Sequence, residues 1–226
     1  MVGMVRHWGG GREPVEFEIA DLVIAGWTGR DAAGLQHHID ELKAIGVKPP
    51  SGVPLFYRVD RGLLTTDTSI DVVGTGTSGE VETVIFSVGG LWVGLGSDHT
   101  DRAAEAYSVA LSKQLCRKVV APELWRFDEV APHWDRLILR AHAVAGGKRR
   151  LYQEGSTAVI RDPRELMARF TGNGSGLPEG TVMFCGTQPA IGGIAAADRF
   201  EMELEDPVLG RSMRCAYDIR TLPLVS

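Results

Sequence analysis

The sequence lacks long apolar runs and concentrated positive charge. No stretch approaches the roughly 18 consecutive apolar residues of a membrane-spanning helix. The first residues, MVGMVRHWGGGREP, are glycine-rich and charged, which is not the pattern of a secretory signal peptide. The net charge is −5, and the longest Lys/Arg cluster is residues 148–150, so no nucleic-acid-binding surface is expected. We expect a cytoplasmic protein with neither membrane nor nucleic acid as its partner.

Cysteine is scarce, and internal repeats and low-complexity linkers are absent. The three cysteines, Cys116, Cys185 and Cys215, are widely spaced in apolar sequence, which predicts reduced thiols rather than a disulfide framework or a zinc site. The 226 residues, 44% hydrophobic and 23% charged, have the composition of a globular protein. Because no linker divides the chain, we expect a single domain over residues 1–226.

Strand patterns outnumber helix patterns along the chain. Apolar spacing and capping residues predict helices over residues 31–45 and 101–113 and from Asp162, which precedes a proline. Alternating or β-rich segments predict the strands VEFEIADLVIA (15–25), PLFYRV, SIDVVG, EVETVIFSV, LWVGLG, RLILRAHAVA, TVMFCGT, RFEMELED and MRCAYDI. Gly89 and Gly90 favour a hairpin between EVETVIFSV and LWVGLG. The pattern predicts a mainly β domain with flanking helices, of the α+β class.

Two carboxylates are adjacent on one face of a predicted strand. In GEVETVIF (79–86), Glu80 and Glu82 are two residues apart, and an extended chain points such side chains the same way. Asp98, in GSDHTDR, follows one hairpin later and would complete a three-carboxylate site of the kind that Mg²⁺, Mn²⁺ or Ca²⁺ prefers. The spacing alone leaves three interpretations open: a cation site, solvent-exposed acids, or a pair of salt bridges to Arg102.

The motifs around these carboxylates resemble those of the fumarylacetoacetate hydrolase superfamily. GEVETVI followed by SDHTDR is similar to its E-x-E and N-D-x-x-A-R-D motifs, and residues 151–193 resemble its Q-x-G-x-T strand, a helix, its L-x-x-G-D-x-I strand and its G-T-P-x-G-V-G loop. Arg102 and Lys118 follow Asp98 by four and twenty residues, as in the superfamily. HIDEL and PLFYR are similar to the H-x-x-E lid helix and P-x-x-F-x-K strand of acylpyruvase-like members. AGWTGRD, GSDHTDR and HWDRL also look like a bacterial family defined only as a domain of unknown function.

The resemblance implies a fold, a metal site and an assembly. It implies a fumarylacetoacetate hydrolase-like mixed β-roll, in which residues 1–60 form an N-terminal strand, a lid helix and a connecting strand. The implied ligands of a Mg²⁺ or Mn²⁺ ion, with Ca²⁺ as an alternative, are Glu80, Glu82 and Asp98. It also implies a homodimer.

The resemblance further implies roles for individual side chains. His38 and Glu41 occupy the H-x-x-E positions and would activate a water molecule. Lys118 would fix the substrate carboxylate or protonate the leaving carbanion, whereas Lys113 has the wrong offset for this role. The implied substrate-binding residues are Arg58, which stands where the acylpyruvase-like enzymes carry lysine, Arg102, Gln153 and Thr187.

These roles imply a divalent-metal-dependent hydrolase. It would cleave a C–C bond in a small oxo-carboxylic acid, of acylpyruvate or fumarylacetoacetate type, through a metal-stabilised enolate. The alternatives are a decarboxylase, hydratase or isomerase acting on the same type of acid, because a fold does not fix a reaction. A further alternative is a non-catalytic metabolite-binding protein that has lost the metal.

The sequence departs from the superfamily pattern at three places near the expected site. Only fifteen residues separate Glu82 from Asp98, fewer than is usual, which leaves Asp101 as an alternative third ligand. Glu105 stands where the superfamily has glutamine, and the tripeptide G-T-P is G-T-Q at residues 186–188. These changes affect the identity of the substrate more than the fold.

Overall fold

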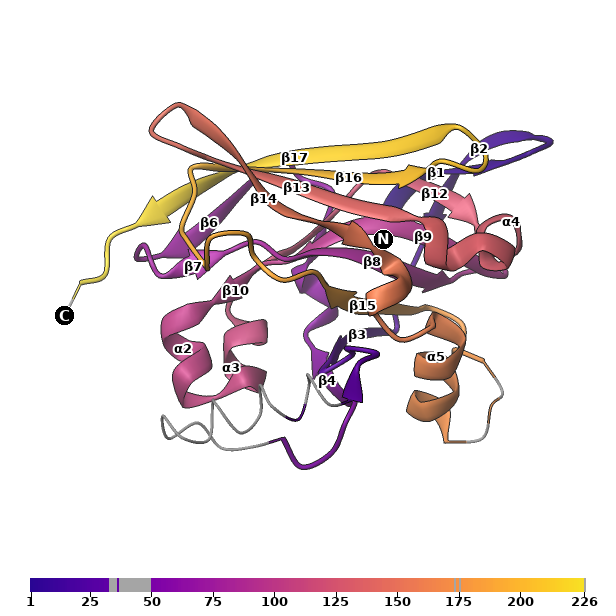
Figure 1. Cartoon of the computed structure of the whole chain (residues 1–226), viewed down its shortest axis with the longest axis horizontal. Coiled ribbons are helices and arrows are strands. Elements are labelled where there is room, and N and C mark those ends of the chain that lie inside the picture. Colours follow the sequence, from indigo (N-terminus) through magenta and orange to yellow (C-terminus); the bar gives the residue numbers. More distant parts are fainter. Residues whose placement is uncertain (33–35, 37–49, 173, 175, 226) are drawn as a thin grey trace.

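A computed structural model describes residues 1–32, 36, 50–172, 174 and 176–225 (Figure 1). The helix predicted over residues 31–45 lies almost wholly outside the described residues. His38 and Glu41 lie outside them too, so their predicted roles stay predictions. Among the helices that are described, none is long and apolar enough to cross a membrane.

Two β-sheets pack against each other and form the body of the molecule (Figure 1). The larger sheet has the order β2-β1-β12-β9-β8-β15-β3-β4, and β11 joins it by pairing with β9 and β5. Its strands are β1 (Val2–Trp8), β2 (Gly11–Phe17), β3 (Asp21–Gly26), β4 (Leu55–Val59), β5 (Leu64–Thr65), β8 (Val81–Ser87), β9 (Leu91–Asp98), β11 (Lys118–Val120), β12 (Glu123–Arg126) and β15 (Thr181–Thr187).

The smaller sheet has five strands in the order β14-β13-β16-β17-β6. These are β6 (Ser69–Val73), β13 (Ile138–Ala145), β14 (Lys148–Ser156), β16 (Arg199–Asp206) and β17 (Arg211–Leu222). A separate pair is formed by β7 (Thr77–Ser78) and β10 (Thr100–Asp101). The fold is therefore mainly β, as the sequence predicted.

Short helical segments lie around the periphery of the two sheets (Figure 1). The described helices are α2 (Arg102–Tyr107), α3 (Val109–Gln114), α4 (Phe127–Val130) and α5 (Pro163–Thr171), and the described 3₁₀ segments are η1 (Arg61–Leu63), η2 (Ala131–Arg136) and η3 (Thr157–Val159). The predicted helix over 101–113 is interrupted at Ser108, where φ is −159° and the side chain caps α3 by accepting from the N–H of Leu111. Because of this interruption, α3 is a separate helical segment.

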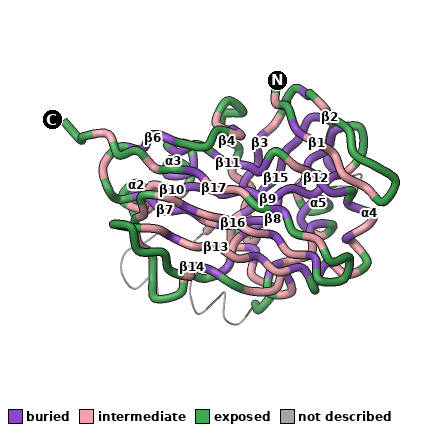
Figure 2. Tube along the Cα trace, turned by 90° about the horizontal axis from the view of Figure 1, so that it is seen from above, coloured by how far each residue is buried: buried purple, intermediate pink, exposed green. Residues whose placement is uncertain are grey.

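The central strands of the larger sheet are buried on both faces (Figure 2). In β8, Val81 and Ile85 belong to the core between the sheets, whereas Val84 and Phe86 belong to a second core on the opposite face. Because side chains alternate along a strand, Glu82 shares the face of Val84. The E-x-E pair therefore points away from the smaller sheet.

The N-terminal third differs from the sequence prediction at two places. The strand predicted over residues 15–25 is two strands, since the chain leaves β2 after Phe17 and enters β3 at Asp21. Residues 1–14, which carry no clear pattern, form most of an antiparallel hairpin in which β1 pairs with β2. Most of the side chains of β2 are exposed, so this hairpin has little of the apolar alternation that marks a strand.

Candidate metal centre and active site

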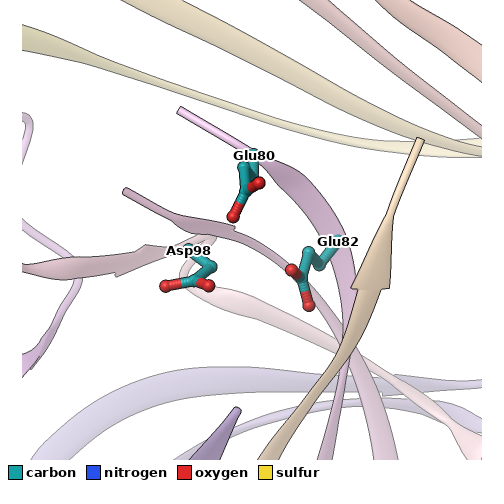
Figure 3. A group of neighbouring side chains, drawn as sticks. All are labelled: Glu80, Glu82 and Asp98. Carbon is teal, nitrogen blue, oxygen red and sulfur yellow. The ribbon is translucent and has the colours of Figure 1, made fainter. Parts of the chain in front are cut away.

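Three carboxylates converge at one end of the β8–β9 hairpin (Figure 3). Glu80 directly precedes β8, Glu82 is within it, and Asp98 is the last residue of β9. The N–H of Asp98 donates to the carbonyl of Glu80 over 3.0 Å, so the strand pairing itself sets these two residues opposite each other. One oxygen from each carboxylate lies within 4.8 Å of the others. Asp101 is not in this cluster and instead caps α2 by accepting from the N–H of Ala104.

A tight turn joins β8 and β9. Asp98 can therefore return to the side of Glu82 although only fifteen residues separate the two. The N–H of Val88 donates to the carbonyl of Gly90 over 2.9 Å, and Gly89 and Gly90 have positive φ values of 59° and 111°. Glycine accepts such a conformation without a Cβ clash. The predicted hairpin is therefore confirmed.

Glu82 differs from the other two carboxylates in its surroundings. Its side chain is buried and accepts a hydrogen bond from the N–H of Gly186 over 2.7 Å. Burial, together with the charges of Asp98 and Glu80, raises the pKa of Glu82 well above its usual value. No ion pair joins Glu82 to a cationic side chain of the described residues. A largely buried set of three carboxylates, one of which forms no ion pair with a described residue, fits a hard divalent cation such as Mg²⁺ or Mn²⁺.

Two lysines contact Asp98. Nζ of Lys118 lies 2.7 Å from Oδ1 of Asp98 and donates to the carbonyl of His99 over 2.7 Å. Nζ of Lys113 lies 2.6 Å from Oδ2 of Asp98 and 2.7 Å from Oε2 of Glu80. Burial lowers the pKa of Lys113, but Asp98 and Glu80 outweigh it and the net pKa is raised, so Lys113 is charged.

Lys113 is the functional candidate that the sequence reasoning set aside. Its offset from Asp98 does not match the superfamily lysine, which corresponds to Lys118. The spacing of Arg102, Ala106, Val109 and Lys113 nevertheless follows one face of the predicted helix, and all four line the cavity. Helical periodicity from Arg102 was therefore the signal that pointed to Lys113.

Arg102 is held between two carboxylates and a hydroxyl group. Its Nη2 lies 3.0 Å from Oε1 of Glu80, its Nη1 donates to Oε2 of Glu105 over 2.8 Å, and its Nε donates to Oγ of Ser78 over 2.8 Å. Burial lowers the pKa of Arg102, but the charges of Glu80 and Glu105 outweigh burial, and the net pKa is raised above its usual value. The guanidinium is thus a fixed positive charge beside the carboxylate cluster.

A buried hydrogen-bond network contacts the backbone next to the carboxylate cluster. Nδ1 of His99 lies 2.9 Å from the hydroxyl of Tyr217, and Nε2 lies 2.9 Å from Oγ1 of Thr77. Burial lowers the pKa of His99 to about 3, so this imidazole is neutral. Tyr217 also contacts Oγ of Ser97, which accepts from the N–H of Glu80. The network fixes the backbone on both sides of the hairpin.

Gln153 and Thr187 hold the backbone between the two glutamates. Oε1 of Gln153 accepts from the N–H of Val81 over 3.0 Å, and Oγ1 of Thr187 donates to the carbonyl of Val81 over 2.8 Å. Nε2 of Gln153 also donates to Oγ1 of Thr187 over 2.7 Å. Both side chains line the cavity, and both bind the Val81 backbone between Glu80 and Glu82.

Arg58 lies away from the carboxylate cluster. Its side chain is 66% exposed, stacks over the ring of Phe170 and lies 3.9 Å from Asp21. Its neighbour Tyr57 lines the cavity, because adjacent residues of a strand point to opposite faces. The described part of the cavity wall does not include Arg58.

The carboxylates form the floor of a cavity of about 760 Å³. Apolar side chains form part of the wall, including Ile24, Trp27, Tyr57, Val109, Ala190 and Ile194. Trp27 has a positive φ of 60°, which is uncommon for a non-glycine residue, and its Nε1 donates to the hydroxyl of Tyr57 over 3.1 Å. The cavity thus joins a charged floor to an apolar wall, as in many small-molecule sites.

The structure sorts the residues predicted for the site into four groups. Lys118 lies beneath the cluster without lining the cavity, Arg58 lies outside it, and His38 and Glu41 are outside the described residues. The predicted residues that line the cavity are Glu80, Glu82, Asp98, Arg102, Gln153 and Thr187.

Comparison with protein families identifies one match. Residues 25–217 match the family described as "Protein of unknown function (DUF2848)". The chain belongs to this family. A search of curated proteins gave no match to the sequence.

Solved structures similar to this DUF2848 chain come from the fumarylacetoacetate hydrolase family. A provisionally assigned fumarylacetoacetate isomerase/hydrolase from Oleispira antarctica is 16% identical, with a TM-score of 0.68 and coverage of 97% of this chain and 100% of that one. A provisionally assigned fumarylpyruvate hydrolase from Burkholderia cenocepacia is 17% identical, with a TM-score of 0.62 and coverage of 98% and 92%. A 2-keto-3-deoxy-D-arabinonate dehydratase complexed with magnesium and 2,5-dioxopentanoate is 16% identical, with a TM-score of 0.64 and coverage of 92% and 75%. At such identities these matches establish the fold, and they confirm the fold that the sequence motifs predicted.

Proposed function

We propose that the protein is a divalent-metal-dependent enzyme that hydrolyses a C–C bond in a small oxo-carboxylic acid of acylpyruvate or fumarylacetoacetate type. The observation that carries this proposal is the convergence of Glu80, Glu82 and Asp98 on the floor of a cavity that also presents two cationic side chains. The donor set suits Mg²⁺ or Mn²⁺. The dehydratase with magnesium and 2,5-dioxopentanoate supports an oxo-acid as the class of ligand.

The charged, polar and apolar side chains of the cavity have different roles in this proposal. A bound divalent cation would supply Lewis acidity toward a carbonyl oxygen of the oxo-acid. Arg102 and Lys113 place positive charge where an anionic substrate enters. Gln153 and Thr187 keep Glu80 and Glu82 at a fixed separation through the Val81 backbone. The apolar wall accommodates the part of the substrate that carries no charge.

The choice of hydrolysis rests on the predicted pair of His38 and Glu41. At positions i and i+3 of the helix predicted from the sequence, they would serve as a water-activating base and the residue that orients it. A dehydratase acting on the same type of acid is the second candidate, because one structural neighbour is a dehydratase. The two reactions share the cavity and differ in whether water is added or lost.

The test is a product assay on chelator-treated protein supplied with Mg²⁺ or Mn²⁺. Mass spectrometry would follow an acylpyruvate panel, in which hydrolysis adds water and yields pyruvate plus a carboxylic acid, and a panel of 2-keto-3-deoxy sugar acids, in which dehydration removes water. We expect metal-dependent hydrolysis, its loss in Glu82→Gln, and its retention in Glu16→Gln, which changes an exposed glutamate of β2.

The remaining outcomes would change the proposed base or the proposed function. Hydrolysis at full rate in Glu41→Gln would rule out the proposed pair of His38 and Glu41 as the source of the base. The proposed metal site would not be affected by this result. Dehydration alone would select the second candidate. Absence of turnover together with absence of metal binding by calorimetry would instead support the non-catalytic metabolite-binding protein. We also propose a homodimer, which light scattering on the purified protein would test.

A further inference from the structure

Lys113 contacts two of the three carboxylates that would hold a metal ion. Its Nζ lies 2.7 Å from Oε2 of Glu80 and 2.6 Å from Oδ2 of Asp98, and it donates to Oγ1 of Thr100 over 3.0 Å. Its side chain is only 8% exposed. The ammonium group therefore bridges two of the three carboxylates, through a short, charge-assisted hydrogen bond to Glu80 and an ion pair with Asp98.

The position of α3 fixes this bridge. Ser108 ends α2 and caps α3, so the second helical segment starts in a new direction. Lys113 and Ser112 are the buried residues of α3, and the hydroxyl of Ser112 donates to the carbonyl of Val109. Lys113 reaches the cluster because its helix face lines the cavity.

Local charge disfavours holding the ammonium bridge and a metal ion in the site at the same time. Four carboxylates, those of Glu80, Glu82, Asp98 and Glu105, stand against three cationic side chains, those of Arg102, Lys113 and Lys118. With all four carboxylates ionised, as metal binding requires of Glu82, the local formal charge is −1, and a divalent cation would bring it to +1 with every side chain in place. Uncompensated charge in a buried site is costly. Departure of one ammonium group restores neutrality.

Lys113 is the ammonium group that can leave. Lys118 is fully buried, is anchored on the carbonyl of His99 and does not line the cavity. Lys113 lines the cavity, and its long flexible side chain can turn into that space.

On the basis of the proposed metal-dependent function, we propose that Lys113 is a built-in cation that competes with the divalent metal for Glu80 and Asp98. The metal ion binds only when the ammonium group withdraws into the cavity. Lys113 therefore sets the metal affinity of this site, and the chain binds the metal more weakly than its three carboxylates alone would allow.

The first test is calorimetric titration of Mn²⁺ into chelator-treated wild type, Lys113→Met and Lys113→Arg. Methionine keeps the length and apolar stem of lysine and removes the charge, so we expect its Kd for Mn²⁺ to fall by about tenfold or more. Lys113→Arg keeps a positive charge, and we expect its Kd to stay within about threefold of wild type. Circular dichroism would verify the fold of each variant.

A second test uses the wild-type protein and does not depend on a variant that folds. Acetylation of lysines, read by peptide mass spectrometry, would report the accessibility of Lys113 with and without Mn²⁺. We expect Mn²⁺ to increase the labelling of Lys113 severalfold, because the displaced ammonium group enters the cavity. Lys148, an exposed residue of β14, serves as the internal control and is expected to label equally in both conditions.

The outcomes separate this inference from the proposed function. If wild type binds Mn²⁺ and Lys113→Met binds it no more tightly, or if Mn²⁺ leaves the labelling of Lys113 unchanged or lower, the competition is disproved while the metal site stands. If neither wild type nor Lys113→Met binds Mn²⁺, the metal-dependent function fails, and the inference fails with it.

Discussion

The backbone N–H of Gly186 donates a hydrogen bond to Oε2 of Glu82 over 2.7 Å, deep inside the protein. This bond links the end of β15 to the middle carboxylate of the cluster. Gly186 has a positive φ of 110°, and a Cβ at this position would lie 1.8 Å from Oγ1 of Thr28. Because no other residue fits this backbone and this space, the orientation of Glu82 depends on glycine at position 186.

Gly186→Ala is expected to destabilise the protein and to weaken metal binding. Strained backbone of this kind costs about 1–3 kcal/mol, and the clash with Thr28 adds to that cost. Thermal unfolding and Mn²⁺ calorimetry would measure the two effects. Gly172→Ala is the matched control, since Gly172 also has a positive φ, of 70°, but a Cβ added there would have no atom within 4 Å. Equal Mn²⁺ affinity in the two variants would contradict the role given to Gly186.

The carboxylate cluster was predictable because it depends on local geometry. The two-residue period of a strand places Glu80 and Glu82 on one face, and the glycine turn brings Asp98 back beside them. Sequence reasoning left open whether that face meets solvent. The structure answers this, since Glu82 is 2% exposed and Asp98 is fully buried.

Other parts of the site depend on tertiary packing that no short pattern encodes. The helical spacing from Arg102 pointed to Lys113, but the break at Ser108 that begins α3 was not predicted. Arg58 occupies the position of a superfamily lysine, yet its place in β4 turns it away from the cavity. The resemblance carried over a sequence position, whereas the direction of a side chain depends on strand register.

Tyr57 and Arg58 offer a direct test of that strand register. Tyr57 lines the cavity and accepts from Nε1 of Trp27, whereas Arg58 packs on Phe170 at the surface. Once a substrate is found, we expect Tyr57→Ala to raise KM by about tenfold, the effect of losing about 1–2 kcal/mol of contacts. Arg58→Ala is expected to change KM by less than about threefold. A larger effect of Arg58→Ala on KM would support the predicted contact between Arg58 and the substrate.

Asp206 predicts a pH dependence of stability that is independent of the metal site. It is fully buried and accepts from Nε2 of His133 over 2.9 Å and from the N–H groups of Val208 and Leu209 over 3.1 Å. Burial raises the pKa of Asp206, but these hydrogen bonds outweigh burial and lower the pKa below its usual value. Its stabilising contribution is therefore complete above the unfolded-state pKa of about 3.9 and is lost as pH falls through the folded-state value.

Asp206→Asn should accordingly lower the free energy of unfolding by about 1–3 kcal/mol at pH 7, because charge-assisted bonds are lost. The difference from wild type should shrink as the pH is lowered below about 4. Urea unfolding at pH 7, 5 and 3.5 would measure it. Asp128→Asn is the control, because the side chain of Asp128 is 81% exposed. A difference that grows toward low pH would contradict this assignment.

Gln153 shows how a residue outside the carboxylate cluster controls its geometry. It is 2% exposed, and its amide group binds the N–H of Val81 and the hydroxyl of Thr187. Gln153→Leu keeps the size of the side chain but leaves the buried N–H of Val81 without its partner, which costs about 1–3 kcal/mol. Because Val81 lies between Glu80 and Glu82, we also expect the Kd for Mn²⁺ to rise by about tenfold.

Gln114→Leu is the matched control for this effect. Gln114 is exposed and binds the N–H of Asp60, so its loss should leave the Kd for Mn²⁺ within about twofold of wild type. Calorimetry at a temperature where both variants are folded separates metal affinity from stability. If Gln153→Leu loses stability but keeps wild-type Mn²⁺ affinity, Gln153 supports the fold alone, and the separation of the two glutamates must be set by the β8–β9 pairing.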